Sequence, residues 1–373
     1  MSVEPLRTRF SGLNRVQAGI VFVAAAVFLA SCILAVRGGR LEPKNTTSDT
    51  DGRMYQRVVQ RLQTGENYYD ALGSELRNGK YPSKSVFNWR SPFHLMALAV
   101  MTEPVSRYML AAFALAASIL AGMATNRGGG PGAVQILVTM VALSECFIFD
   151  RGLHLYVFAE VWAGVFITIS VAAYALDWWP AGVSAGIMAL FLRELALPYV
   201  VVSWLIALRK RSRREFYAWT AGLLGWTVYF LIHSQFAMSH MREGDIALHA
   251  GPAQFLGWVR FGGPRFLVET VRMSLLHTLP PWVAAATLTI MLFGAAGWTT
   301  GIGQRVAAVV AVYMAAFSIV GLPVDQAWGA LTNPVLAFGL VWFVPAMRDL
   351  IGALFRSRGP LAPSVSGHRP GPG

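Results

Sequence analysis

Long apolar runs recur along this chain, and they constrain its fold more than any other feature. Each is close to the roughly 20 residues that an α-helix needs to cross the hydrocarbon core of a bilayer. Only 13% of the 373 residues are charged, whereas a soluble domain carries about a quarter. We therefore expect an all-α polytopic membrane protein. The clearest candidate spans are residues 17–36, 106–124, 132–149, 154–176, 216–236, 281–299, 305–322 and 333–351.

Two further apolar stretches do not fit a single span. The stretch 178–208 is too long for one crossing and is interrupted by Arg193–Glu194 and Pro198. An ion pair costs much less at the membrane surface than in hydrocarbon, so we expect two short helices that meet at Arg193–Glu194. The stretch 93–102 is too short to span and is expected at the interface. The sequence thus predicts about ten membrane-crossing helices.

Basic residues near the apolar runs predict the orientation, because short cytoplasmic loops carry an excess of Lys and Arg. The strongest such signal is the loop 209–214, and further arginines precede the first run and follow the last. Both ends of the chain are therefore expected in the cytoplasm, and the long loops 37–92 and 237–280 outside. We expect a single transmembrane domain over 1–356. The tail 357–373, rich in Gly, Pro and Ser, is expected to be disordered and cytoplasmic.

Charge and cysteine content exclude several other classes of protein. The net charge of +12 mostly flanks the apolar runs, so it indicates topology rather than nucleic-acid binding. The abundance of Arg fits the inner (plasma) membrane of a bacterium. Cys32 and Cys146 lie inside apolar runs, so we expect neither a disulfide nor a metal site from them. No small-residue cleavage pattern follows the first run, which predicts a retained helix rather than a signal peptide.

The first outside loop carries most of the residues that suit chemistry. Apolar residues spaced one helical turn apart predict an amphipathic helix over 53–63 that lies on the membrane. Asp49 or Asp51 would cap its N-terminus, which is the purely structural interpretation of these aspartates. The two could also hold a hard divalent ion, but two carboxylates alone give incomplete coordination. We therefore assign no metal site.

Three motifs follow one another in this loop, and their order is informative. They are Asp51-Gly-Arg-Met-Tyr55, Gly65-Glu-Asn-Tyr-Tyr69 and Trp89-Arg-Ser-Pro92. In order and spacing they resemble the pattern Asp-x-x-x-Tyr, helix, Gly-x-x-x-Tyr and aromatic-x-Pro-Pro of the GT-C class of membrane glycosyltransferases, in particular its mannosyltransferase-like members. Ser91 replaces the first proline of the last motif.

The resemblance continues downstream, over roughly residues 15–215. Leu192-Arg193-Glu194 and the basic loop 209–214 match the short helix ending in a cation and the inside loop of that class. Gly152-Leu-His-Leu departs from its Gly-Gln-x-Asn-like corner. The resemblance implies a GT-C-like helical fold, a sugar donor carried on polyprenyl phosphate, and an acceptor hydroxyl on a glycan, lipid or protein. We assign no cofactor, and a divalent metal ion remains the alternative.

Inverting sugar transfer needs a base for the acceptor proton and cations at the departing phosphate. The resemblance implies Asp51 as that base, with Asp49 as the runner-up. It also implies that Arg193 holds the carrier phosphate and that Glu194 orients it, because the planar fork of Arg suits phosphate oxygens. The remaining residues that we expect to bind substrate are Tyr55, Tyr69, Arg90 and His249.

Each of these residues also has a plainer interpretation. Arg193 and Glu194 would simply pair with each other at a helix turn. Arg90, next to an interface tryptophan, would extend to the lipid headgroups. The loop 237–280, which contains His249, would be a surface linker rather than a cover over the site.

Two other functions compete with the transferase. A multi-pass transporter or flippase for a lipid-linked or small polar substrate would usually show repeated halves with matched broken helices, and only one break, at 193–198, is evident. A glycan polymerase or ligase of another membrane fold would usually place its large loop late in the chain. Here the richest loop follows the first apolar run, which disfavours that alternative.

Overall fold

The computed structural model of the protein describes residues 7–37, 51–147, 154–247, 259–321 and 325–356. Regular structure in these residues is helical, apart from one isolated antiparallel bridge between Val259 and Val320. The expected all-α class is thus confirmed. The amphipathic helix expected over 53–63 is also present, as part of a helix that begins at Asp51.

The helices follow the apolar runs of the sequence closely. The α-helices are α1 (Arg15–Val36), α2 (Asp51–Gln63), α3 (Tyr68–Asn78), α4 (Pro92–Ala99), α5 (Glu103–Arg127), α6 (Gly132–Ala142), α7 (Ser144–Phe147), α8 (Ala159–Ala175), α9 (Trp179–Leu192), α10 (Leu197–Arg209), α11 (Arg213–His240), α12 (Gly263–Val271), α13 (Pro281–Gly297), α14 (Gly301–Ile319) and α15 (Gly329–Phe355). Short 3-10 helices join several of them: η1 (Arg9–Gly12), η2 (Val86–Asn88), η3 (Leu155–Val157), η4 (Glu194–Ala196), η6 (Leu275–Thr278) and η7 (Asp325–Trp328).

The number of membrane spans differs from the prediction of about ten. Within the described ranges, 4 segments are long and apolar enough to cross a membrane: Arg15–Val36, Glu103–Arg127, Gly301–Ile319 and Asp325–Phe355. Four further helices, α6, α8, α9 and α13, are apolar but at most 17 residues long. At about 1.5 Å per residue they reach about 25 Å, less than the roughly 30 Å of a hydrocarbon core. Helix α11 is longer, but polar residues such as His233 and Gln235 interrupt its apolar sequence.

The stretch 178–208 forms two helices, as predicted. Helix α9 ends at Leu192, and α10 begins at Leu197 with Pro198 in its first turn. Proline lacks the amide hydrogen that a continuing helix would need, so it favours a helix start. Arg193 lies between the two helices with an extended backbone, φ −150° and ψ 121°. Its side chain is therefore presented at the ends of two helices rather than in the middle of one.

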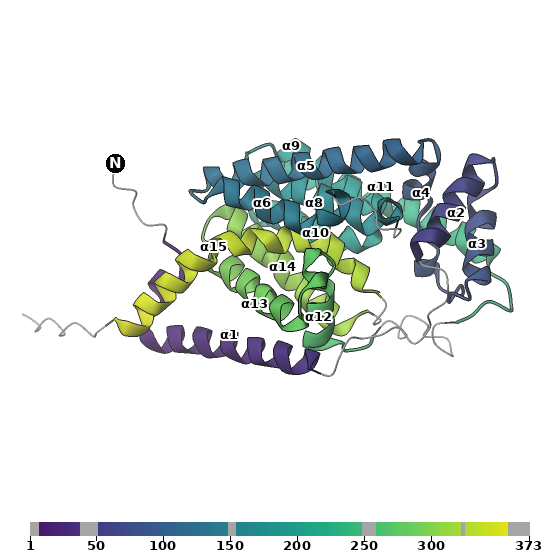
Figure 1. Ribbon diagram of the computed structural model, residues 1–373. Coiled ribbons are helices and arrows are strands. Elements are labelled where there is room, and N and C mark those ends of the chain that lie inside the picture. The colour runs from purple at the N-terminus through teal and green to yellow at the C-terminus, as the bar shows by residue number, and fades with distance from the viewer. Residues whose placement is uncertain (1–6, 38–50, 148–153, 248–258, 322–324, 357–373) are drawn as a thin grey trace, which may run out of the picture.

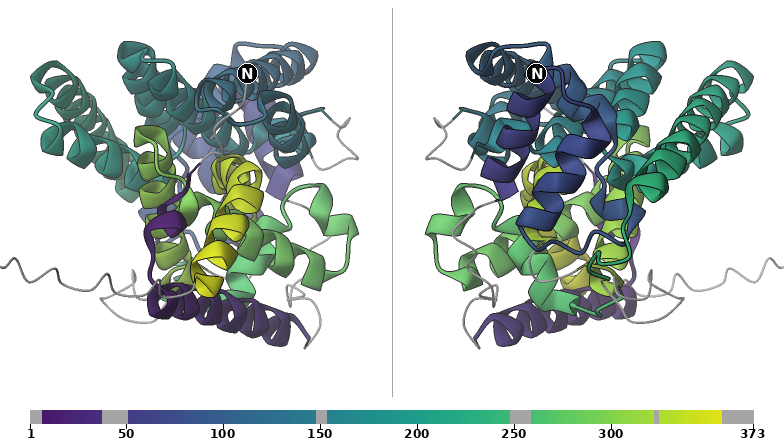
Figure 2. Two further views of the ribbon diagram at one scale, coloured as in Figure 1. Left: turned by 90° about the vertical axis from the view of Figure 1, so that its left-hand side faces the viewer. Right: turned by 90° about the vertical axis from the view of Figure 1, so that its right-hand side faces the viewer.

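The two ends of the molecule differ in structure. Helices α1 and α5 run along its length, whereas α2 and α3 lie together at one end (Figure 1). Helix α11 leans away from the other helices (Figure 2), and the carbonyl oxygen of its last residue, His240, accepts a 2.7 Å hydrogen bond from Arg77 of α3. At the opposite end, the Thr8 amide donates to Asp349 at 2.7 Å. The first and last described segments thus lie on the same side of the bundle, opposite α2 and α3.

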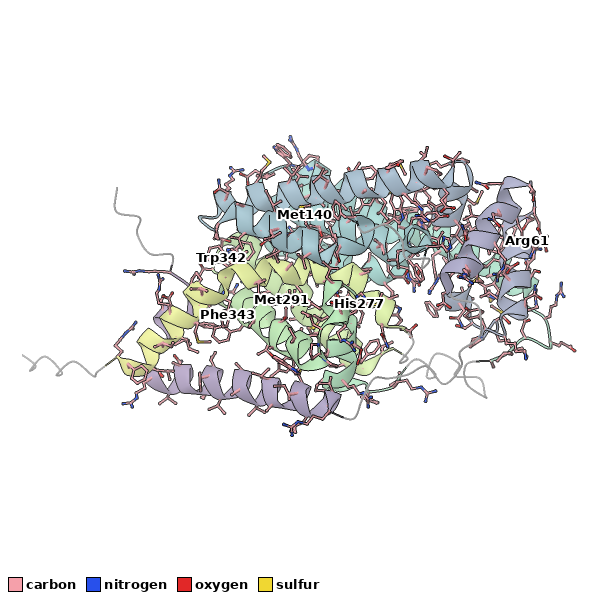
Figure 3. The ribbon with its side chains drawn as sticks, viewed as in Figure 1. Arg61, Met140, His277, Met291, Trp342 and Phe343 are labelled. Carbon is pink, nitrogen blue, oxygen red and sulfur yellow. The ribbon has the colours of Figure 1, made fainter. Side chains whose placement is uncertain are left out.

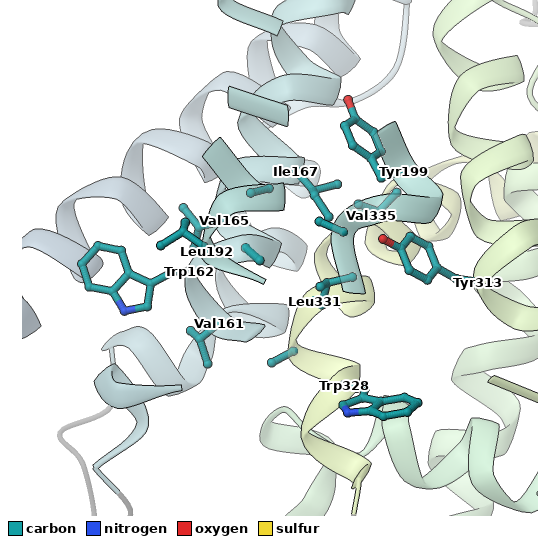
Figure 4. Close-up of a cluster of buried hydrophobic side chains, with 14 of the residues drawn as sticks. Val161, Trp162, Val165, Ile167, Leu192, Tyr199, Tyr313, Trp328, Leu331 and Val335 are labelled. Carbon is teal, nitrogen blue, oxygen red and sulfur yellow. The ribbon is translucent and has the colours of Figure 1, made fainter. Parts of the chain in front are cut away.

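Helices α13 and α15 pack backbone against backbone. A Cβ atom on Gly294 would lie 1.9 Å from the carbonyl oxygen of Gly339, and a Cβ atom on Gly339 would lie 1.9 Å from that of Met291. Only glycine permits such an approach, which is characteristic of helix pairs in membranes. Elsewhere large side chains fill the interior: Figure 4 labels Ile167 of α8, Tyr313 of α14 and Val335 of α15, which belong to one buried cluster.

Apolar side chains also cover much of the outer surface. In α1 only 11% of the candidate span is buried, and Val16, Ile20 and Val27 are 70%, 64% and 62% exposed. Such a surface is unfavourable in water but natural in contact with lipid tails. The end that carries α2 and α3 has many polar side chains, among them Arg61, which Figure 3 labels. The apolar helices therefore indicate a membrane-embedded protein in contact with lipid.

Candidate functional site

Asp51 and Tyr55 lie one helical turn apart on α2, at the end of the molecule that α2 and α3 form. Asp51 is the first described residue of the helix, and capping of this helix by Asp49 or Asp51 stays a prediction. A carboxylate in the first turn is favoured by the partial positive charge of the helix N-terminus. Its side chain is exposed, and the Tyr81 hydroxyl donates a hydrogen bond to its Oδ1 at 2.5 Å.

Tyr55 faces inward and contacts Arg90. It is only 7% exposed, and its hydroxyl oxygen accepts a hydrogen bond from Arg90 Nε at 2.9 Å. Arg90 lies in the short loop between η2 and α4, and the Tyr68 hydroxyl fixes that loop by donating to the Arg90 carbonyl oxygen at 2.5 Å. Helices α2 and α3 therefore both hold Arg90, one through its side chain and the other through its backbone.

Arg193 approaches the same place from the corner between α9 and α10. It is 2% exposed, and its Nε lies 2.8 Å from Oε1 of Glu160, in the first turn of α8. The two atoms form an ion pair, but the N–H is not aligned for a hydrogen bond. Glu194 holds the Nη1 of Arg193 from the adjacent position. Two carboxylates thus hold one deeply buried guanidinium.

These side chains surround a small pocket. Besides Tyr55, Glu160 and Glu194, the two arginines, Ser91 and His94 line it. The space amounts to about 300 Å³ when its open mouth is included, but its enclosed part holds no more than about one water molecule. The formal charges of two guanidiniums and two carboxylates cancel. We call this the arginine pocket.

Arg90 retains capacity to bind a further acceptor. Its Nη2 lies 3.7 Å from Glu160 Oε1, which is too long for a hydrogen bond. Burial acts to lower the pKa of Arg90, but Tyr55 and the carboxylates of Glu160 and Glu194 outweigh burial and raise it. For Tyr55 burial acts in the other direction, and it raises the pKa of the hydroxyl despite the neighbouring guanidinium. Arg90 therefore stays charged and Tyr55 stays protonated at neutral pH.

Tyr69, which we expected beside these residues, lies elsewhere. Its hydroxyl contacts Nδ1 of His233 on α11 at 3.1 Å, and its ring stacks on Phe236 and His240, with centroid distances of 5.5 and 5.3 Å. It lines a separate, wider pocket between α3 and α11. The structure thus brings together Tyr55, Arg90, Arg193 and Glu194 of the expected site residues, with Asp51 one turn away.

Two of the expected residues, Asp49 and His249, lie outside the described ranges. Conversely, the sequence analysis did not single out Glu160 and His94. Glu160 could have been noticed, because it is an acidic residue at the start of an otherwise apolar run, and such residues in membrane proteins usually have a partner or a function. Within the described part of the chain, no three His, Cys, Asp or Glu side chains are grouped as metal ligands would be.

The chain matches no family model, no curated protein and no solved structure. Its function is therefore inferred from the residues and their geometry. The feature with most chemical content is the arginine pocket, because it places two cations from distant parts of the sequence around one opening at the end of a helix bundle. A guanidinium presents several N–H donors in one plane and matches the oxygens of phosphate and carboxylate groups.

Proposed function

We propose that the protein is an inverting glycosyltransferase that moves a sugar from a polyprenyl-phosphate carrier to a hydroxyl of a glycan, lipid or protein. The observation that carries the proposal is the convergence of Arg90 and Arg193 on one pocket at the α2–α3 end. A lipid phosphate placed in the headgroup layer is an anion that such a pair suits. The order of motifs in residues 51–92 adds support, because it resembles that of GT-C transferases.

The sugar transfer would proceed in a single displacement. The acceptor oxygen forms a bond to the anomeric carbon while the bond from that carbon to the phosphate oxygen breaks, and the configuration inverts. Asp51 takes the proton of the acceptor hydroxyl. Arg193 and Arg90 stabilise the negative charge that builds up on the departing polyprenyl phosphate. Asp51 suits its role because it is exposed and lies one turn from Tyr55, which contacts Arg90.

The donor phosphate must first displace a carboxylate, because the enclosed part of the pocket is so small. Glu194 is the group expected to move, since its side chain is 14% exposed compared with 4% for that of Glu160. Glu160 would remain and keep Arg193 charged and oriented. In this scheme Glu194 pairs with Arg193 when no donor is bound, and the donor phosphate replaces the Glu194 carboxylate.

The topology that accompanies this proposal places the α2–α3 end outside. Both ends of the chain would then lie in the cytoplasm, together with the basic loop 209–214. The membrane would be the inner (plasma) membrane, and the donor would enter the arginine pocket from the outer leaflet. The packing of the segment around Thr8 against Asp349 supports a common side for the two ends.

The test of the proposed base is Asp51→Asn in membranes supplied with a labelled polyprenyl-phosphate sugar. We expect transfer of label to fall about 10²- to 10⁴-fold, because proton transfer by a positioned group contributes about that much. Asp177→Asn is the matched control, since Asp177 is an exposed aspartate that pairs with Arg127 at 2.6 Å, away from the pocket. Wild-type transfer by the Asp51 variant would remove this residue from the base role.

A transporter or flippase is the second candidate, and one observation favours it. Helices α9 and α10 form a broken pair whose corner carries a buried charge, as in many transporters. Proteoliposomes distinguish the two functions. Movement of a lipid-linked substrate across the bilayer without transfer of its sugar would favour transport.

A further inference from the structure

The wider pocket at the α2–α3 end lies between α3 and the end of α11. It comprises about 940 Å³ when its open part is included. Its lining is strongly polar and includes Asp70, Ser74 and Asn78 from α3 and Ser239 and His240 from α11. Unlike the arginine pocket, it is open enough to admit a molecule of several rings as it stands.

A second pocket adjoins this one, and one of its lining residues contacts Asp51. Arg77 and Arg242 line both, so the two pockets are neighbours, and we call them together the outer groove. The second part of the groove is also lined by Tyr81, whose hydroxyl donates to Asp51 at 2.5 Å. Asp51 is thus connected to the outer groove through Tyr81 and to the arginine pocket through Tyr55, one turn along α2.

The charges of the outer groove balance. Arg77 pairs with Asp245 at 2.9 Å, and Arg61 pairs with Glu66 at 2.6 Å. Asp70 and the exposed Arg242 add one charge of each sign. Hydroxyl and amide groups supply donors and acceptors between these charges. A polyanion or an acyl chain would gain little from such a lining, whereas a neutral molecule rich in hydroxyl groups would find partners along its whole length.

We propose that the outer groove binds the acceptor as a neutral oligosaccharide, with one of its hydroxyl groups reaching Asp51. This inference rests on the proposed sugar transfer and assigns the acceptor to a place of its own, separate from the donor phosphate. The acceptor hydroxyl approaches Asp51 from the Tyr81 side, and the donor approaches from the Tyr55 side. The base then lies between the two substrates, where a single displacement requires it.

A chain of hydrogen bonds connects the groove to the arginine pocket. The Trp89 carbonyl oxygen can only accept, so Nε2 of His233 donates to it at 2.7 Å. Nδ1 of a neutral His233 then accepts from the Tyr69 hydroxyl at 3.1 Å. Tyr69 lines the groove, and Trp89 directly precedes Arg90. A residue that lines the groove is thus joined through His233 to the loop that carries Arg90.

The experiment measures binding of saccharides directly. The probe is a pool of neutral oligosaccharides of about two to six residues, released from the envelope of the cells that make the protein and labelled with tritium at the reducing end. Wild-type protein in nanodiscs is compared with Arg242→Gln and Asn78→Ala, whose side chains are exposed and line the groove. Glu243→Gln is the control, because Glu243 is an exposed neighbour outside the lining.

We expect wild type and Glu243→Gln to retain the same fraction of the pool, and Arg242→Gln to lower the affinity about tenfold, as the loss of a charged hydrogen bond would. Asn78→Ala should lower it less. No retention by the wild type, or equal retention by all four proteins, would overturn the groove assignment. Arg193→Gln should bind the pool normally. Binding without any sugar transfer would instead refute the proposed function and leave a saccharide-binding groove.

Discussion

Two clusters of buried charged residues lie at opposite ends of α8. Comparing them distinguishes a candidate ligand-binding site from an ion pair that only supports the fold. Glu160, near the start of the helix, belongs to the arginine pocket. Tyr174, near its end, belongs to the second cluster, where the guanidinium of Arg305 lies 3.6 Å from its ring centroid. At about 1.5 Å per residue the two ends are about 21 Å apart. Both clusters bury an arginine that is at most 3% exposed.

The clusters differ in what surrounds the buried cation. Arg305 pairs with one carboxylate, Glu215, at 3.5 Å, and it is covered by the Tyr174 ring, whose hydroxyl accepts from Trp219 Nε1 at 2.9 Å. Arg193 instead meets two carboxylates and borders an open pocket that a second arginine also lines. The Arg305 cluster has one carboxylate and a covering ring, so we call it the closed cluster and expect it to hold helices together. The Arg193 cluster has a second carboxylate and borders a pocket, so we call it the open cluster. There a ligand can replace one of the carboxylates.

The largest effect is expected on stability, at the closed cluster. Arg305→Gln leaves Glu215 buried without its cation, which typically costs about 3–5 kcal/mol. We expect the free energy of unfolding in mixed micelles to fall by about that amount, while sugar transfer per folded molecule stays unchanged. The double variant Arg305→Met/Glu215→Leu should recover most of the loss, because a buried ion pair is often no better than apolar residues of similar size. A double variant as unstable as the single one would contradict this interpretation.

The next effect is expected on activity, at the open cluster. Arg193→Gln should lower kcat for sugar transfer about 10²- to 10³-fold, because it removes a donor to the departing phosphate. The loss of stability should be smaller than for Arg305→Gln, since Arg90 remains 3.7 Å from Glu160. Arg193→Met/Glu160→Leu should fold and yet stay inactive. Recovery of transfer in that double variant would show that both clusters are structural.

The positions of the helices could be predicted from the sequence, but their lengths could not. Runs of apolar residues indicated each long helix, and the cost of burying Arg193–Glu194 indicated the break between α9 and α10. The predicted number of spans was wrong because the position of a helix end depends on tertiary contacts, which cannot be read from a run of apolar residues. The run 132–149, for example, forms one helix as far as Ala142, a turn at Leu143 and then the short helix α7 from Ser144 to Phe147.

The site was predicted in part, and the gaps have physical reasons. Arg90 and Arg193 could be singled out because a cation near a membrane interface needs a partner. Glu160 could not be joined to them, because only folding brings it next to Arg193. The motif selected Tyr69, but its neighbour Tyr68 is the one that contacts the Arg90 loop. Adjacent residues of a helix point about 100° apart, so a motif gives the order of residues and not the pocket that each one faces.

The smallest effect that still distinguishes the two clusters is a change in the donor KM, and we expect it from replacing Arg by Lys. Arg90→Lys keeps the positive charge but replaces a planar fork by a single ammonium group. One ammonium cannot reach the Tyr55 hydroxyl and a phosphate oxygen in the geometry that the guanidinium spans, so we expect the KM for the lipid-linked donor to rise about tenfold, equivalent to about 1.4 kcal/mol. Arg305→Lys is the matched exchange at the closed cluster and should lower stability slightly without changing the donor KM. Initial rates measured against donor concentration, together with unfolding in mixed micelles, report both effects. An unchanged donor KM in Arg90→Lys would mean that Arg90 only supports the fold, as Arg305 does.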